Sequence, residues 1–197
     1  MSKWEAMLVL ASQSPRRREI LANAGIPFTV RAPYVPEERR DGETAEDYVR
    51  RLAGDKALAV ECHDNETILS ADTVVVVKDA ILEKPRDHSD AVRMLRLLSD
   101  CEHQVLTGIC LRSRSVKILD IASTRVHFAH LTGAEIEEYV RSGEPMDKAG
   151  GYAIQGLASK FIDRIEGCYF NVVGLPISLV YRHLKELGFG SGTESPS

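Results

Sequence analysis

The chain has 197 residues, of which 44% are hydrophobic and 27% charged, and its formal net charge is −4. A chain of this length and composition can bury one sizeable core, with room for a second small lobe, which excludes a disordered protein. The acidic balance argues against a general nucleic-acid binder and against a protein of anionic membrane surfaces, because both normally carry a basic excess.

The cysteines and the apolar segments indicate where the protein works. The four cysteines are scattered without a CxxC pair, no early apolar stretch has the form of a signal peptide, and no run approaches the roughly 18 apolar residues of a membrane span. We therefore expect a soluble protein of the reducing cytoplasm. A zinc site built from Cys62, His63, Cys101 and His103 is the weaker alternative, because these spacings match no common ligand pattern.

The first part of the chain predicts a strand, a tight turn and a helix. Residues 7–11 have the apolar run of a short buried strand. Residues 14–24 follow as a helix, with Ser14 able to cap it and Pro15 at its first helical position. Residues 28–32 predict a second strand.

The middle of the chain alternates helical and strand patterns. A helix with apolar residues at helical spacing begins after Thr44. Residues 68–77 are β-branched and nearly continuously apolar, which is typical of an interior strand. A helix is predicted at 89–98, and two long strands at 104–112 and 116–129 predict a hairpin.

The last third of the chain begins with a capping box. Thr132 and Glu135 open a helix that ends near a polar, glycine-rich loop at 143–156. A strand at 160–165 and a helix at 176–187 complete the predicted elements.

These elements predict an α/β fold with a mixed central sheet flanked by helices. Strand–helix steps imply parallel neighbours in the sheet, whereas the hairpin implies antiparallel ones. The chain contains no internal repeat and no convincing linker, so we expect residues 1–189 to form one domain, with two lobes around a cleft. Residues 190–197, "GSGTESPS", predict a flexible tail.

Several ionisable groups lie where an amphipathic pattern would not place them. Arg16 and Arg17 occupy the first turn of a helix, although the macrodipole there favours carboxylates. Lys56 shares the apolar stripe of its helix, and Asp72 interrupts the buried strand, where an ionised carboxylate needs a partner. Taken singly, Lys56 is also explained by a packed stem with a solvated ammonium, and Asp72 by a satisfied turn.

Two further lysines and an acidic loop extend this set. Lys84 and Lys148 lie in loops, where a solvated charge or an exposed ion pair is the ordinary interpretation. Together with the helix-start arginines they favour a bound polyanion, because helix N–H groups and guanidinium groups both bind phosphate oxygens. Asp72, with Glu37 or Glu38, would then hold a divalent cation or orient a water.

The common nucleotide and hydrolase motifs are absent from the sequence. It contains no GxxxxGK[ST], no GxGxxG and no GxSxG segment. Ser12 and Ser14 have no evident His and Asp partners that would make either one a nucleophile. We therefore expect phosphate-directed hydrolysis by an activated water rather than covalent catalysis.

Several blocks of sequence, taken in order, resemble the Maf family of nucleotide pyrophosphatases over about residues 7–187. The blocks are "LASQSPRRREIL", "RLAGDKA", "SADTVVVV…LEKPRD" and "GEPMDKAGGYAIQG", followed by "NVVGLP". Their order and spacing together are highly specific, and the visible departures are confined to the termini. The resemblance implies a mixed sheet flanked by helices, with an active-site cleft between two lobes, similar to inosine triphosphate pyrophosphatases.

The resemblance also implies a reaction and a set of site residues. A Maf enzyme hydrolyses a nucleoside triphosphate between the α and β phosphates, aided by Mg²⁺ or Mn²⁺, and is expected to be a homodimer. By resemblance Asp72 is the base that activates water and, with Glu38, a metal ligand. The residues that resemble the phosphate and substrate ligands are Ser12, Arg16, Arg17, Lys56, Lys84 and Lys148.

Two positions point to pyrimidine substrates within that family. The subgroup that resembles dTTP and UTP pyrophosphatases has Thr after the Asp and Gln in the late loop, and this chain has Thr73 and Gln155. Arg16 belongs to the same specificity set by resemblance. The amide of Gln155 offers both a donor and an acceptor, which suits the edge of uracil or thymine, whereas a carboxylate would suit a cationic methylated guanine.

The sequence therefore predicts a dTTP/UTP pyrophosphatase that also hydrolyses modified pyrimidine nucleotides. One alternative is a pyrophosphatase for 7-methyl-GTP or another non-canonical nucleotide. The 7-methyl-GTP subgroup typically has Gln and Glu where this chain has Thr73 and Gln155, which favours the pyrimidine substrates. The other alternative is a nucleotide-binding regulator of septum formation, because the family is linked with septum inhibition.

Overall fold

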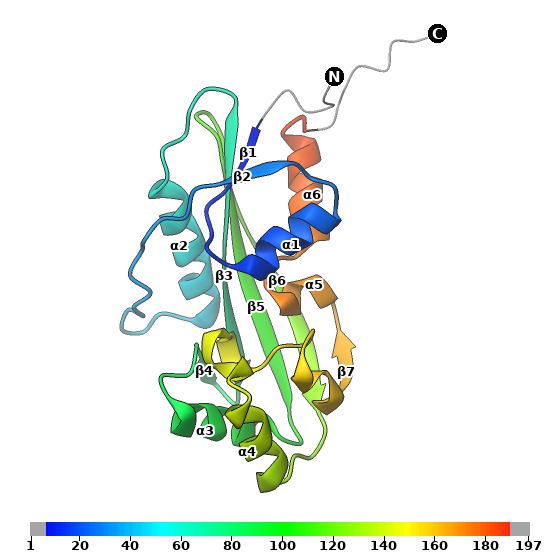
Figure 1. The fold of residues 1–197 in the computed structure, drawn as a ribbon. Helices are drawn as coiled ribbons and strands as arrows, with labels where there is room; N and C mark the ends of the chain where they lie inside the picture. Colours follow the sequence, from blue (N-terminus) through cyan, green and yellow to red (C-terminus); the bar gives the residue numbers. More distant parts are fainter. Residues whose placement is uncertain (1–6, 190–197) are drawn as a thin grey trace.

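Residues 7–189 are described in the computed structural model, where helices flank a seven-stranded sheet (Figure 1). The strands are β1 (Met7–Leu10), β2 (Phe28–Val30), β3 (Glu66–Val77), β4 (Ala80–Leu82), β5 (Glu102–Arg112), β6 (Lys117–Phe128) and β7 (Ile162–Glu166). The α-helices are α1 (Pro15–Asn23), α2 (Ala45–Leu58), α3 (His88–Leu98), α4 (Gly133–Arg141), α5 (Tyr169–Val173) and α6 (Ile177–Glu186). The 3₁₀ helices are η1 (Glu144–Asp147), η2 (Ala149–Gly151) and η3 (Leu157–Phe161). The tail expected at 190–197 lies outside the described residues.

The sheet has the mixed topology that the sequence predicts. Its strand order is β2-β1-β3-β5-β6-β7, with β4 also paired to β3. β1 is parallel to both β2 and β3, whereas β4 and β5 run antiparallel to β3, and β6 and β7 continue the antiparallel part. The interior position of β3 and the β5–β6 hairpin are therefore both confirmed.

The helix boundaries follow from capping residues. Ser14 caps α1 by accepting a hydrogen bond from the backbone of Arg17, and Thr132 forms a complete capping box with Glu135 at the start of α4. The five-residue helix α5 is not predicted, because so short a segment shows no helical periodicity. Across residues 7–189, none of the helices combines the length and the apolar content that crossing a membrane requires.

The two faces of the sheet are covered by different helices. Helix α2 covers one face with apolar side chains such as Leu52 and Ala53, which pack against alternate residues of β1, β3 and β5. Helices α1, α3, α4 and α6 contribute to the larger core on the opposite face. Figure 1 shows α1 and α6 across the sheet from α2. Because strand side chains alternate between faces, Asp72 of β3 meets α2, whereas Thr73 beside it meets α1.

A gap in strand pairing lies at the centre of β3. On one side β3 pairs with β1 through residues 66–69 and with β4 through residues 75–77. Residues 70–74 pair with neither of these two strands, although their other side pairs with β5. We call residues 70–74 the sheet gap. It exposes Asp72 and Thr73 to side chains from helices on both faces, at the end of β1 where the chain turns into α1.

An ion pair at the start of β3 makes folding sensitive to acid. Glu66 is 6% exposed and accepts hydrogen bonds from the Arg31 guanidinium and from the backbone of His63 at 2.9 Å. The Arg31 hydrogen bond lowers the pKa of Glu66 to about 2, although burial opposes the shift. Because the pKa is lower in the folded state than its ordinary value of 4.5, this stabilisation is present above pH 4.5 and is lost as the pH falls towards 2.

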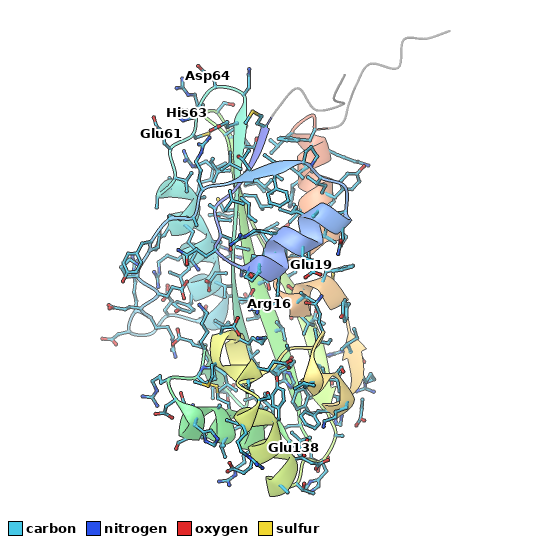
Figure 2. The ribbon with its side chains drawn as sticks, viewed as in Figure 1. Arg16, Glu19, Glu61, His63, Asp64 and Glu138 are labelled. Atoms are coloured by element: carbon cyan, nitrogen blue, oxygen red, sulfur yellow. The ribbon has the colours of Figure 1, made fainter. Side chains whose placement is uncertain are left out.

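Replacing Glu66 by Gln is therefore expected to destabilise the protein at neutral pH and to reduce its acid sensitivity. We expect a loss of about 1–3 kcal/mol at pH 7, the usual range for a hydrogen bond to a charged group. Urea unfolding at pH 7 and pH 3 measures both effects. Glu138→Gln, on the exposed side of α4, is the matched control (Figure 2). A variant that keeps the full acid sensitivity of the parent would contradict this role of Glu66.

Candidate active site

A cleft of about 830 Å³ opens at the sheet gap. It is lined by segments that lie far apart in sequence: the turn into α1, the loop after β2, helix α2, the end of β4 and the loop that contains η1 and η2. Nearly all the residues predicted for the site line this one cleft, and they are Ser12, Arg16, Arg17, Lys56, Asp72, Thr73, Lys84, Lys148 and Gln155.

Arg17 is held by three acceptors from different segments. Its Nε donates to the carbonyl of Gly174 at 2.8 Å, and its Nη atoms donate to Ser12 Oγ at 3.2 Å and to Thr73 Oγ1 at 3.1 Å. Burial lowers the pKa of Arg17, and the nearby charge of Asp72 opposes that shift. The guanidinium is thus fixed beside the sheet gap, and its unusual place in the first helical turn is explained by these partners.

Arg16 and Lys148 share one carboxylate across the cleft. Arg16 donates to Asp147 Oδ2 at 3.0 Å and to the Asp147 carbonyl at 3.3 Å. Lys148 contacts Asp147 Oδ1 and donates to the carbonyl of Glu144 at 2.8 Å. Figure 2 shows Arg16 at the start of α1, on the side that faces the η1–η2 loop. Asp147 therefore holds two predicted phosphate ligands together.

Lys56 and two carboxylates form the centre of the site. The Lys56 ammonium lies 2.5 Å from Asp72 Oδ1 and 2.5 Å from Glu37 Oε1, and Lys84 lies 3.5 Å from Glu37 Oε2. Lys56 comes from the last turn of α2, which packs on the face of the sheet that Asp72 faces. The lysine on the apolar stripe and the carboxylate in the buried strand are therefore partners.

The two carboxylates have pKa values shifted in opposite directions. Burial raises the pKa of Asp72, and the opposing effects of Lys56 and Arg17 do not reverse the shift. Burial also raises the pKa of Glu37, but Lys56 and then Lys84 more than offset it, so the net shift is downward. Asp72 thus has the stronger affinity for a proton, which suits a general base, and Glu37 stays ionised.

The two loop glutamates considered as metal ligands are placed differently. Glu37 lines the cleft and contacts Lys56 and Lys84, whereas Glu38 does not line it. The metal role of Glu38 stays a prediction, and Glu37 is the loop glutamate that the structure places in the cleft. Consecutive loop residues point in different directions, and the sequence had no periodicity there to choose between them.

The donor set fits a divalent cation in the presence of phosphate. Oxygens of Asp72 and Glu37 converge on the single Lys56 ammonium, each at 2.5 Å. Within the part of the chain that the structure describes, no group of three or more His, Cys, Asp or Glu side chains is placed to hold a metal ion. Mg²⁺ commonly binds one or two carboxylates together with substrate phosphates and waters. Asp72 and Glu37 match that pattern.

Sequence reasoning missed an acidic and aromatic pair in the cleft. Tyr48 of α2 donates a hydrogen bond to Glu83 Oε1 at 2.5 Å, and both residues line the cleft. Burial and then the Glu83 contact raise the pKa of Tyr48, so its hydroxyl stays protonated. Tyr48 occupies an apolar position of its helix and Glu83 lies next to Lys84, so the pattern alone gave neither a reason to be singled out.

A buried polar chain behind the cleft was also missed. Thr73 Oγ1 lies 2.9 Å from Thr107 Oγ1, which donates to the carbonyl of Asn171 at 3.3 Å. The Asn171 amide nitrogen in turn donates to Thr124 Oγ1 and to the Val105 carbonyl, both at 3.0 Å. Asn171 is the first residue of the "NVVGLP" block, so these contacts give that block a structural role behind the cleft. This series of hydrogen bonds fixes Thr73 and, through Thr73, Arg17.

Gln155 lines the same cleft from the loop that follows η2. It is exposed and follows Ala153 and Ile154, which also line the cleft. The arrangement therefore combines clustered cations able to bind a polyphosphate, a buried carboxylate able to accept a proton, and an amide at the rim able to read a ring edge.

Comparisons with known proteins agree with this geometry. The family model described as Maf-like protein matches residues 7–187. The dTTP/UTP pyrophosphatase of Koribacter versatilis is 49% identical over 182 residues, covering 92% of this chain and 94% of that protein. The dTTP/UTP pyrophosphatase of Vibrio cholerae is 49% identical over 172 residues, covering 86% and 92%.

The fold also has a solved counterpart. The structure of the Staphylococcus aureus Ham1 protein superposes with a TM-score of 0.51 at 12% identity, covering 92% of this chain and 99% of that one. At that identity the likeness concerns the fold alone, and it agrees with the predicted mixed sheet flanked by helices. Because the family model spans nearly the whole described chain and the relatives are 49% identical, the chain belongs to the Maf family.

Proposed function

We propose that the protein hydrolyses dTTP and UTP, and modified pyrimidine nucleotides, to the nucleoside monophosphate and pyrophosphate. The observation that carries this proposal is the cleft itself, which cations from four separate segments line together with the buried carboxylate of Asp72, the partner of Lys56. Such a cluster suits a triphosphate, whose oxygens can take the place of the carboxylates that pair with these cations. The relatives named dTTP/UTP pyrophosphatase support the pyrimidine substrates.

The residues divide into phosphate binding and proton transfer. Arg16 and Lys148 would exchange Asp147 for phosphate oxygens, and Arg17 would add a guanidinium fixed by Ser12 and Thr73. Asp72 would take a proton from the attacking water, which adds across the anhydride between the α and β phosphates and releases pyrophosphate. Lys56 would keep Asp72 oriented while binding phosphate.

A divalent cation, Mg²⁺ or Mn²⁺, would be held by Asp72 and Glu37 with phosphate oxygens of the substrate. When bound it would neutralise charge that develops on the phosphates. The homodimer and the cytoplasmic location stay predictions.

A nucleotide panel tests the proposal. Purified protein is incubated with dTTP, UTP, 5-methyl-UTP, CTP, GTP, inosine triphosphate and 7-methyl-GTP, with Mg²⁺, with Mn²⁺ or with a chelator, and pyrophosphate and orthophosphate are assayed separately. Pyrophosphate release that is fastest with dTTP and UTP and that needs the metal is the expected result. A preference for 7-methyl-GTP or inosine triphosphate would overturn the specificity, and orthophosphate release would overturn the reaction class.

Thr73 and Gln155, two of the three residues predicted to set specificity, are expected to act differently. Thr73 contacts Arg17 and Thr107, whereas Gln155 is exposed at the rim. We expect Gln155→Glu to lower kcat/KM for UTP about 10-fold or more relative to GTP, because a carboxylate cannot donate to a pyrimidine carbonyl. Thr73→Gln should lower kcat/KM for all nucleotides by displacing Arg17. The double variant should show both the general loss of kcat/KM and the change in the ratio of UTP to GTP.

Steady-state kinetics with UTP and GTP measure this ratio. Gln104→Glu, an exposed position on β5 outside the cleft, introduces the same charge and is the matched control. An unchanged ratio in Gln155→Glu would refute base reading by this amide.

A further inference from the structure

The backbone on both sides of Gln155 is tied to one pair of side chains. Glu144 Oε2 accepts a hydrogen bond from the backbone N–H of Leu157 at 3.1 Å. Glu144 Oε1 accepts one from the Tyr139 hydroxyl at 2.8 Å, and the same hydroxyl oxygen accepts one from the backbone N–H of Ala153 at 3.2 Å. Ala153 precedes Gln155 by two residues and Leu157 follows it by two. We call residues 153–157 the Gln155 loop.

Gly156 allows this contact for a steric reason. A β-carbon built on Gly156 would overlap the carboxylate of Glu144, with the carboxyl carbon at 2.5 Å. The backbone angles of Gly156 are φ −107° and ψ −148°, so no left-handed conformation requires glycine there. The carboxylate lies directly against the backbone next to Gln155, and the glycine provides the space.

The pair is anchored in the core rather than in the loop. Tyr139 is 3% exposed on α4, and its ring packs edge-on against Phe161 with centroids 5.6 Å apart. Glu144 begins η1, and its backbone carbonyl, not its carboxylate, accepts the hydrogen bond from Lys148. The side chain of Glu144 therefore binds the Gln155 loop, whereas its backbone carbonyl binds Lys148, a predicted phosphate ligand.

We propose that Tyr139 and Glu144 are positioning residues for base recognition, which hold the Gln155 loop so that the Gln155 amide meets the edge of a pyrimidine. The inference rests on the proposed function, since it takes Gln155 as the reader of the base. It predicts that the side chains of Tyr139 and Glu144 control the choice of base without affecting phosphate binding, because neither side chain contacts a cationic residue of the cleft.

Three variants isolate the pair. Tyr139→Phe removes the shared hydroxyl, Glu144→Ala removes the carboxylate, and Glu144→Gln keeps an acceptor for Leu157 and a polar contact for Tyr139. Each of Tyr139→Phe and Glu144→Ala removes one hydrogen bond to the Gln155 loop, besides the bond between the two side chains. We expect each to lower the ratio of kcat/KM for UTP to that for GTP by about 2- to 10-fold, the range for one hydrogen bond to the loop. Combining them should lower the ratio little further, and Glu144→Gln should restore most of it.

Two measurements separate positioning from a merely structural effect. Inhibition by inorganic tripolyphosphate, which has no base, should keep its inhibition constant in all three variants. Thr132→Ala is the matched control, because it removes the cap of α4, the helix that bears Tyr139, without touching the Gln155 loop. It should lower the melting temperature and leave the ratio unchanged.

Two outcomes would overturn the inference. One is an equal fall of kcat/KM for every nucleotide in the variants, accompanied by weaker tripolyphosphate inhibition. The other is a change in the UTP-to-GTP ratio of kcat/KM in Thr132→Ala as large as that in the Tyr139 and Glu144 variants. A wild-type preference for another base would instead overturn the proposed substrates alone, since the variants should then weaken that preference. A wild-type enzyme that releases pyrophosphate from all bases alike would overturn both.

Discussion

Asp72→Asn is expected to lower kcat for pyrophosphate release about 10²- to 10⁴-fold, the usual contribution of a general base. The amide cannot accept the proton of the attacking water, but its oxygen can still accept the hydrogen bond of Lys56, which also keeps Glu37 as a partner. The neutral side chain avoids the cost of burying a charge, so the melting temperature should change little. Steady-state kinetics with UTP and binding of a non-hydrolysable analogue measure the two parts of the prediction.

The same variant distinguishes an enzyme from a nucleotide-binding regulator. An enzyme should lose turnover and keep binding, and any cellular effect that needs hydrolysis should disappear. A pure binder should lose no biological effect. Asp79→Asn is the matched control, because Asp79 lies exposed in the β3–β4 turn with φ 65°, a conformation that Asn also adopts. A kcat for Asp72→Asn within about threefold of the control would contradict the assigned base.

The elements of the fold were predictable because each carries a local signal. Ser14 and Thr132 cap their helices as their spacing indicates, and the apolar run of β3 is interior as its composition indicates. The pairing partners of the strands could not be derived in the same way, because register depends on contacts between distant segments. The sheet gap in particular follows from where β1 leaves β3 and β4 joins it.

In the candidate site, too, the residues with a local signal were predictable, whereas the contacts between distant segments were not. The residue types were predictable, since a lysine on an apolar stripe and an aspartate in a buried strand both need a partner. That Lys56 and Asp72 are each other's partner required the packing of α2 on the sheet. The link between Arg16 and Asp147 spans 131 residues of sequence, and the choice of Glu37 over Glu38 depends on the path of a loop without periodicity.

The close packing of α2 depends on a glycine in the neighbouring strand. Gly108 of β5 pairs with Asp72 in register and faces α2. A β-carbon built on Gly108 would lie 2.6 Å from the carbonyl carbon of Val49 and 2.9 Å from the backbone nitrogen of Arg50. Both contacts are with helix backbone, which cannot rotate aside as a side chain can. The glycine therefore sets how near α2, and with it Lys56, comes to the sheet.

Gly108→Ala is accordingly expected to displace α2 and to damage both stability and activity. Overpacking usually costs 1–3 kcal/mol, and a clash with backbone should cost at least about 3 kcal/mol, which lowers the melting temperature by about 6–12 °C. Turnover should also fall at temperatures where the variant stays folded, because Lys56 is moved away from Asp72. Thermal unfolding and kinetics at low temperature measure these effects. Gly133→Ala, at the start of α4 with no atom within 4 Å of the added carbon, is the control and should be neutral or slightly stabilising. Equal stability of the two variants would show that α2 does not depend on Gly108 for its position.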